Sequence, residues 1–191
     1  MSEPVSAMKG AAFEGIVSIR DAGPRGMVTV RGDLASAKLK DAVTGAAGVN
    51  FPARTGAVLD GARGLAWMSP DEVLVLLPHG DAGGAVAAMR AALAGEHSLI
   101  VDVSDARAVF RLEGEGRLIR EVLAKLTPAD MRASALPIGA MRRTRLAQVP
   151  AAVFFHEAGA AEVICFRSVA EYVFGILRNA ARPGSEVGYF G

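Results

Sequence analysis

Two apolar segments joined by a proline turn constrain the fold more than any other feature of the chain. The first covers residues 64–69 and the second 72–78, with Pro70 and Asp71 between them. Pro70 sets the backbone for the first corner of a turn, and the side chain of Asp71 can close that turn. We therefore predict a β-hairpin, whose strands are antiparallel, and not a doubly wound parallel sheet.

The segments around the hairpin complete a β-α-β-β-α-β order. Asp33 is the expected N-cap of the first helix, and Gly45 is expected to close it. Residues 46–64 contain Pro52 and several glycines, so we expect an irregular surface loop there. We expect a strand at 27–31, a helix at 33–44, a second helix at 80–95 and a further strand at 98–103.

The second half of the chain repeats this order. Its last helix begins with Ser168-Val-Ala-Glu171, a capping-box sequence. Residues 188–190 either add a terminal strand or fray, and a short strand is expected at 15–20. We also expect a strand at 106–112, a helix at 114–128 and three strands at 141–148, 151–156 and 161–167.

The pattern predicts an α+β fold of two fused ferredoxin-like halves that share one core, with antiparallel or mixed sheets and helices on one face. The halves are expected at about 26–104 and 105–190, within a single unit over 13–191. Residues 1–12 are expected to form a flexible leader.

Composition and charge exclude several functional classes. The 21 Lys and Arg residues nearly balance 20 Asp and Glu residues, so no electrostatic footprint for nucleic acid or an anionic membrane exists. The apolar runs are strand-sized and residues 1–12 lack a signal-peptide pattern, which favours a cytoplasmic protein without a membrane span. The hydrophobic content of 51% leaves room for an apolar patch at a subunit interface.

No residue set predicts a catalytic, cofactor-binding or metal centre. Gly114-Glu115-Gly116 lies between a strand and a helix but lacks the third glycine of a dinucleotide site, and Glu115 would repel a phosphate, so we interpret it as a tight turn. The three histidines have no ligand partner at metal spacing. Cys165 lies in an apolar run, where a buried, inert thiol in a reducing compartment is expected.

Four charged residues remain as structural or interface candidates. Arg143 and Arg145 lie on one face of a strand, where they either form a solvated sheet face or clamp an acidic partner. Asp102 and Arg107 flank the turn between the halves, together with Asp105. Because a buried unpaired charge is costly, we predict that Arg107 pairs with a carboxylate of its own chain, most simply Asp102.

Several sequence segments resemble the gamma subunits of bacterial heterotetrameric sarcosine oxidase. The matching segments agree in order and spacing from about residue 13 to 182. They are Trp67-Met-Ser-Pro-Asp-Glu72, Val101-Asp-Val-Ser-Asp-Ala-Arg-Ala108, Leu123-Ala-Lys-Leu-Thr-Pro128-Ala-Asp130, Gly139 with Thr144, and Phe166-Arg-Ser168 with Tyr172.

This resemblance implies a subunit of an enzyme complex and not a free-standing catalyst. Such a complex demethylates sarcosine to glycine, uses FAD, FMN and NAD, and transfers the one-carbon unit to tetrahydrofolate. The family's flavins and substrate belong to the larger subunits, which implies that this chain binds no cofactor and assembles with alpha, beta and delta subunits. The fold implied is that of the folate-binding domain of glycine-cleavage aminomethyltransferases.

Two departures limit what the resemblance transfers. First, we expect the chain to lack the extra C-terminal domain of the aminomethyltransferases. Second, it lacks their paired acidic residues just ahead of the hairpin, since only Asp60 lies in roughly that region. No folate-binding or catalytic role is therefore transferred. A folate or one-carbon binding protein is the alternative function, and a free-standing sarcosine oxidase, which would be yellow, is the third.

Overall fold

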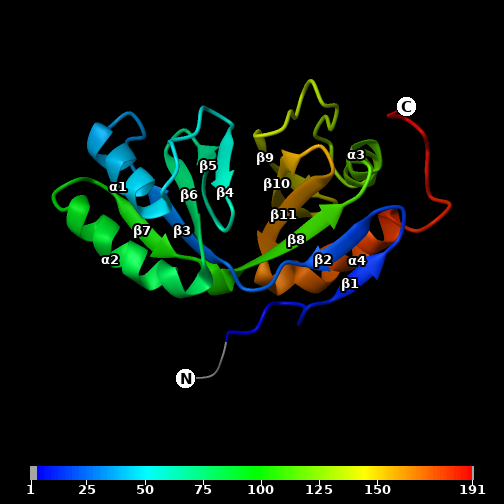
Figure 1. Ribbon diagram of the computed structural model, residues 1–191, viewed down its shortest axis with the longest axis horizontal. Helices are drawn as coiled ribbons and strands as arrows, with labels where there is room; N and C mark the ends of the chain where they lie inside the picture. Colours follow the sequence, from blue (N-terminus) through cyan, green and yellow to red (C-terminus); the bar gives the residue numbers. More distant parts are fainter. Residues whose placement is uncertain (1–3, 191) are drawn as a thin grey trace. The chain divides into compact units, whose positions relative to one another are not determined.

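The computed structural model describes residues 4–190 as two compact units (Figure 1). Unit 1 consists of the chain up to Pro24 together with the chain from Ala106 onward, and unit 2 is Arg25–Asp105. Each unit contains an antiparallel sheet and a pair of α-helices. The α+β class and the two ferredoxin-like halves are thus confirmed, whereas a core shared by both halves stays a prediction.

Unit 2 has the predicted β-α-β-β-α-β order with one additional strand. Its sheet has the strand order β4-β5-β6-β3-β7. The first strand of the motif, β3, therefore lies between its third strand, β6, and its last strand, β7. The elements in chain order are β3 (Gly26–Arg31), α1 (Ala37–Ala47), β4 (Ala57–Asp60), β5 (Arg63–Ser69), β6 (Glu72–Leu77), α2 (Ala82–Ala92) and β7 (Leu99–Asp102).

The hairpin prediction is confirmed, but the loop predicted over 46–64 is only partly correct: residues 48–55 are irregular, whereas a strand forms at 57–60. Strands β5 and β6 pair in antiparallel register, with Leu65 opposite Val75, and the Ser69 hydroxyl bonds to Asp71 in the turn. Strand β4 lies within the predicted loop and pairs with β5, placing Val58 opposite Leu65. Four residues between glycine-rich segments carry too weak a local signal, and the strand forms because β5 offers its free edge.

The caps of α1 also differ from the prediction. The Ser36 hydroxyl, and not Asp33, accepts the backbone N–H of Leu39, while Asp33 accepts the N–H of Ala35 in a turn upstream. The helix continues through Gly45 and ends at Gly48, whose φ of 73° is the left-handed conformation that glycine adopts without strain.

Unit 1 builds a six-stranded sheet from both ends of the chain. The strand order is β1-β2-β8-β11-β10-β9. Strand β2 pairs with β8, placing Ile19 opposite Leu112, and so takes the position of the motif's last strand. The elements are β1 (Ala12–Glu14), β2 (Ser18–Asp21), β8 (Arg107–Glu113), α3 (Gly116–Ala124), β9 (Met141–Leu146), β10 (Val149–Glu157), β11 (Ala160–Phe166) and α4 (Ala170–Ala180).

The ends of unit 1 decide one open alternative and correct one expectation. Residues 188–190 add no strand, and β2 pairs with β8 at that edge of the motif. Ser168 caps no helix: it lies in a 3₁₀ turn, Arg167–Val169, and the N-cap Val169 has no side-chain bond to offer. In the predicted leader, the amides of Met8 and Gly10 donate to Asp21; its flexibility stays a prediction.

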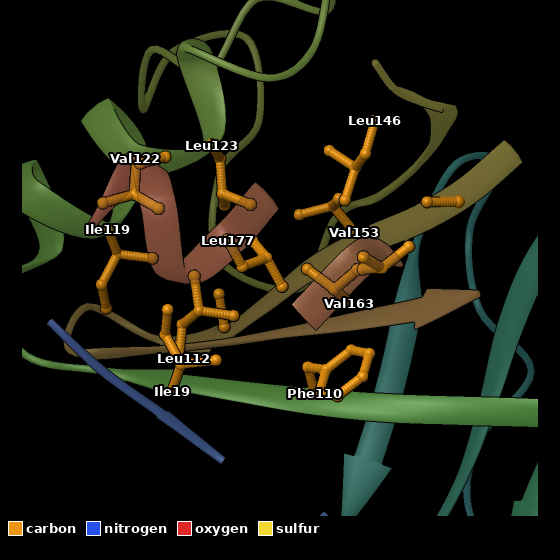
Figure 2. Packing of buried hydrophobic residues seen from close by; sticks show 14 of the residues in the cluster. Ile19, Phe110, Leu112, Ile119, Val122, Leu123, Leu146, Val153, Val163 and Leu177 are labelled. Carbon is orange, nitrogen blue, oxygen red and sulfur yellow. The ribbon is translucent and has the colours of Figure 1, made fainter. Parts of the chain in front are cut away.

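Each unit buries an apolar cluster between its sheet and its helices. In unit 1, Ile119, Val122 and Leu123 from α3 and Leu177 from α4 meet Phe110 and Val163 of the sheet (Figure 2). In unit 2 the cluster includes Val43 of α1 and Met89 of α2. Between residues 4 and 190, no helix is both long enough and apolar enough to cross a membrane.

Candidate functional site

The charged residues predicted at the join have distinct local partners. The Asp102 carboxylate accepts the backbone N–H of Ser104 at 2.9 Å and also its hydroxyl. The Asp105 carboxylate lies 3.2 Å from Nε2 of His79. The guanidinium carbon of Arg107 lies 4.1 Å from the ring centroid of Phe166, its cross-strand neighbour. The predicted pairing of Arg107 with Asp102 joins the two units and stays a prediction.

Arg143 and Arg145 lie on β9, the edge strand of the unit 1 sheet. Both side chains are exposed and share one face, opposite to the face of Thr144. Arg142, on the other face, donates to the carbonyl of Ala135 at 2.9 Å. Among the described residues, Arg145 has no ion pair. The strand therefore presents positive charge at an open edge, as the sequence predicts, and a role in partner binding stays a prediction.

A buried guanidinium that sequence reasoning missed lies on α3. Arg120 is only 8% exposed, and its Nη1 donates to the carbonyls of Met131 and Leu136 at 2.8 and 3.0 Å. Its guanidinium carbon is 4.1 Å from the ring centroid of Phe155. Burial lowers the pKa of Arg120. The side chain thus ties the loop after α3 to the sheet.

The neighbouring Glu121 is also buried and was also missed. Its two carboxylate oxygens accept the backbone N–H groups of Val187 and Gly188, at 2.6 and 2.9 Å. Lys125 lies 3.3 Å from the same carboxylate. The hydrogen bond from Val187, then those from Gly188 and Lys125, hold the pKa of Glu121 below its ordinary value against the opposing effect of burial. The carboxylate therefore stays ionised and binds the chain's C-terminal segment.

The helical pattern explains why these two residues were missed. Ile119, Val122 and Leu123 recur at helical spacing and form an apolar stripe on α3. Positions 120 and 121 lie beside this stripe, where a solvated polar edge is expected. Their burial arises from the loop after α3 and from the C-terminal segment, which cover that edge. The sequence signal that could have indicated their burial is the position of Arg120 and Glu121 directly between the apolar residues Ile119 and Val122.

Cys165 and the pair of His156 and Glu162 are further ionisable groups with low exposure in unit 1. Cys165 is 2% exposed, which confirms the predicted burial, and burial raises the pKa of its thiol to about 12. The predicted inertness of the thiol stays a prediction. His156 Nε2 lies 3.0 Å from the Glu162 carboxylate. Within residues 4–190, no three His, Cys, Asp or Glu side chains are grouped so as to hold a metal ion.

A groove of about 620 Å³ lies between α1 and α2 of unit 2. Small side chains line it, among them Ala42, Gly45 and Ala88. Its charged residues, Arg63 and Asp81, form an ion pair with each other, and Arg63 also donates to the carbonyl of Ala46. The groove therefore has no free acid, base or nucleophile for chemistry.

The glycines of the predicted tight turn in unit 1 have a steric cause. A Cβ on Gly116 would lie 2.2 Å from the carbonyl oxygen of Ala158, and Gly114 has a φ of 148°. The Glu115 carboxylate pairs with Arg117 at 2.8 Å at the start of α3, where a phosphate would have to bind. Glycine is required at Gly116 for the close approach of two backbones.

Comparison with known proteins places this arrangement in one family. Residues 31–182 match the model of the sarcosine oxidase, gamma subunit family. The chain is 34% identical over 146 residues to the sarcosine oxidase subunit gamma of an Arthrobacter species, covering 75% of this chain and 70% of that protein.

Two solved structures share the fold. A chain of the heterotetrameric sarcosine oxidase from Corynebacterium sp. U-96, in complex with pyrrole 2-carboxylate, superposes with a TM-score of 0.77 at 24% identity, covering 90% of this chain and 87% of that one. The glycine cleavage system aminomethyltransferase T from Bartonella henselae gives 0.60 at 15% identity, covering 83% and 44%. By its match to the family model and to its relatives, the chain belongs to the sarcosine oxidase gamma subunit family.

Proposed function

We propose that this chain is a non-catalytic subunit that assembles with the alpha, beta and delta subunits of a heterotetrameric sarcosine oxidase in the cytoplasm. The observation that carries the proposal is the use of three buried ionisable side chains. Arg120 binds loop carbonyls, Glu121 binds backbone amides, and Cys165 is held neutral. Groups committed to the fold in this way are not available as acids, bases or nucleophiles.

The complex would carry out the chemistry that this chain does not. It would demethylate sarcosine oxidatively to glycine with FAD, FMN and NAD bound by the larger subunits, and it would transfer the one-carbon unit to tetrahydrofolate. Membership of the gamma subunit family and the fold shared with a chain of a heterotetrameric sarcosine oxidase support this assignment.

Co-expression with the alpha, beta and delta subunits, followed by gel filtration, tests the assembly. We expect this chain to co-elute with the other three and to lack sarcosine-dependent oxygen consumption by itself. Elution of this chain alone, while the other three form an active enzyme, would refute the proposal.

The exposed face of β9 is the proposed partner surface within this function. Arg145→Glu should weaken co-elution if this edge meets an acidic partner, because like charges at an interface cost affinity. Arg178→Glu, a charge reversal at an exposed position on α4, is the matched control. Equal effects of both variants would remove β9 from the proposed interface.

A folate or one-carbon binding protein is the second candidate. The fold shared with an aminomethyltransferase favours it, although a shared fold is weak support for a shared function. Titration of the isolated chain with a reduced folate by calorimetry separates the two candidates. One-site binding at micromolar affinity would favour folate binding, and absence of heat would favour the non-catalytic subunit.

A further inference from the structure

The segment after α4, residues 181–190, runs beside α3 in space and is called the C-terminal strap from here on. In Figure 1 it is the red segment that passes beside α3. Two side chains contact it: Glu121, on α3, accepts two of its amides, and Lys125, the C-cap residue of α3, donates from Nζ to the carbonyl of Ser185 at 2.6 Å. The strap is therefore attached to a helix more than 60 residues earlier in the chain, since Val187 and Glu121 are 66 positions apart.

The Glu121 contact is the strongest in this set. The carboxylate is 3% exposed, and each of its oxygens accepts a backbone N–H, from Val187 at 2.6 Å and from Gly188 at 2.9 Å. Gly188 has a φ of 72°, a conformation that lets successive amides converge on one anion. Hydrogen bonds to an ionised acceptor are roughly twice as strong as neutral ones.

Apolar packing contributes little to the attachment of the strap beyond α4. Ala181, at the start of the strap, is buried in the apolar cluster of unit 1. Farther along, Val187 is 73% exposed and Tyr189 is 71% exposed, and within residues 185–190 only Phe190 packs against that cluster. Lys125 adds a bond to the carbonyl of Ala180 at 3.1 Å, which also caps the end of α4. Residues 185–190 of the strap are thus held mainly by polar contacts.

We infer that Glu121 is the latch of the C-terminal strap: when its two amide contacts are lost, residues 185–190 open as a unit while α3, α4 and the unit 1 sheet stay folded. Segments held by few buried apolar contacts open locally at lower free energy than the core around them. The inference rests on the strap contacts and not on the proposed function.

Cleavage by a glutamyl endopeptidase tests the latch, because Glu186 is exposed and the next amide, that of Val187, is the one bound by Glu121. In Glu121→Met, release of the peptide 187–191, read by intact mass, should be at least about 10-fold faster, since proteolysis follows the population of the open form. Glu171→Met, at an exposed site on α4, is the matched control and should leave the rate unchanged.

Hydrogen exchange of the same variants completes this test. The amides of Val187 and Gly188 should lose protection in Glu121→Met, whereas those of β8 and β11 should keep it. Unchanged cleavage and unchanged protection at these two amides would overturn the inference.

A truncation at Glu186 keeps the inference testable if Glu121→Met unfolds the whole chain. Removal of residues 187–191 takes away both amide contacts and the segment that covers Glu121, whose carboxylate then keeps only Lys125, at 3.3 Å. Glu121→Met should then change the melting temperature of the truncated chain much less than that of the full chain, because the contacts that it removes are already absent. Additive effects of the two changes would overturn the inference.

Discussion

The guanidinium carbon of Arg120 lies 4.1 Å from the ring centroid of Phe155. This contact places a buried cation against the face of an aromatic ring, which attracts it electrostatically. Among residues 4–190 no carboxylate pairs with Arg120, and two loop carbonyls accept its hydrogen bonds instead. The ring and the carbonyls together replace the missing counter-ion.

Replacing Arg120 with Met should destabilise the chain by about 3 kcal/mol, because it removes the ring contact and leaves two loop carbonyls without their donor. Urea unfolding followed by circular dichroism measures the change. Arg117→Met, which breaks an exposed pair with Glu115, should cost less than about 0.5 kcal/mol. Similar losses in both variants would contradict the structural role of Arg120.

Glu121 should make stability depend on pH in the acid range. Its pKa is lowered in the folded chain from an ordinary value of 4.5, so its contribution is present above that value and is lost as pH falls through the folded pKa. The stability difference between the wild type and Glu121→Gln should be constant near neutral pH and shrink below about pH 4.5. A difference that grows on acidification would have the wrong sign.

Cys165 should be unreactive in the folded chain. With its pKa raised to about 12, the thiol carries almost no thiolate at pH 8, and burial blocks access to it. The reaction with a chromogenic disulfide reagent should be at least about 100-fold slower in buffer than in denaturant. Rapid labelling of the native chain would show that this part of β11 opens.

Arg107 should couple to Phe166 by about 0.5–1 kcal/mol in a double-mutant cycle, because the ring is partly exposed and the contact is partly hydrated. A second cycle with Asp102→Asn tests the ion pair predicted from the sequence. Coupling of roughly 3 kcal/mol would indicate a dry pair, and none would leave Phe166 as the principal partner.

Two glycine-to-alanine changes should have opposite effects. Gly45 lies inside α1 with nothing within 4 Å of an added Cβ, so Gly45→Ala should stabilise the chain by about 0.5–1 kcal/mol. Gly116→Ala should destabilise by about 1–3 kcal/mol, since its Cβ would meet the Ala158 carbonyl. Thermal unfolding of both variants provides the comparison.

The sequence by itself determined the features that depend on neighbouring residues. The hairpin of β5 and β6 follows from Pro70, Asp71 and two flanking apolar runs. Helical periodicity accounts for the burial of Val86 and Met89 on α2 and of Val173 and Leu177 on α4, but it also places Tyr172 on that face of α4, where the side chain is 43% exposed. The burial of Cys165 follows from the apolar run around it. The family was also predictable, because the order and spacing of short sequence segments survive in the chain.

Only the tertiary structure decided the features made by distant segments. Strand β2 pairs with β8 about 90 positions later, β4 forms on the free edge of β5, and the caps of α1 and α4 depend on which nearby group reaches the helix end. Arg120 and Glu121 have the local pattern of a solvated helix edge, yet a loop and the C-terminal strap cover them. Local sequence contains propensities for helix, strand and turn, but the burial of a charge depends on which remote backbone groups satisfy it.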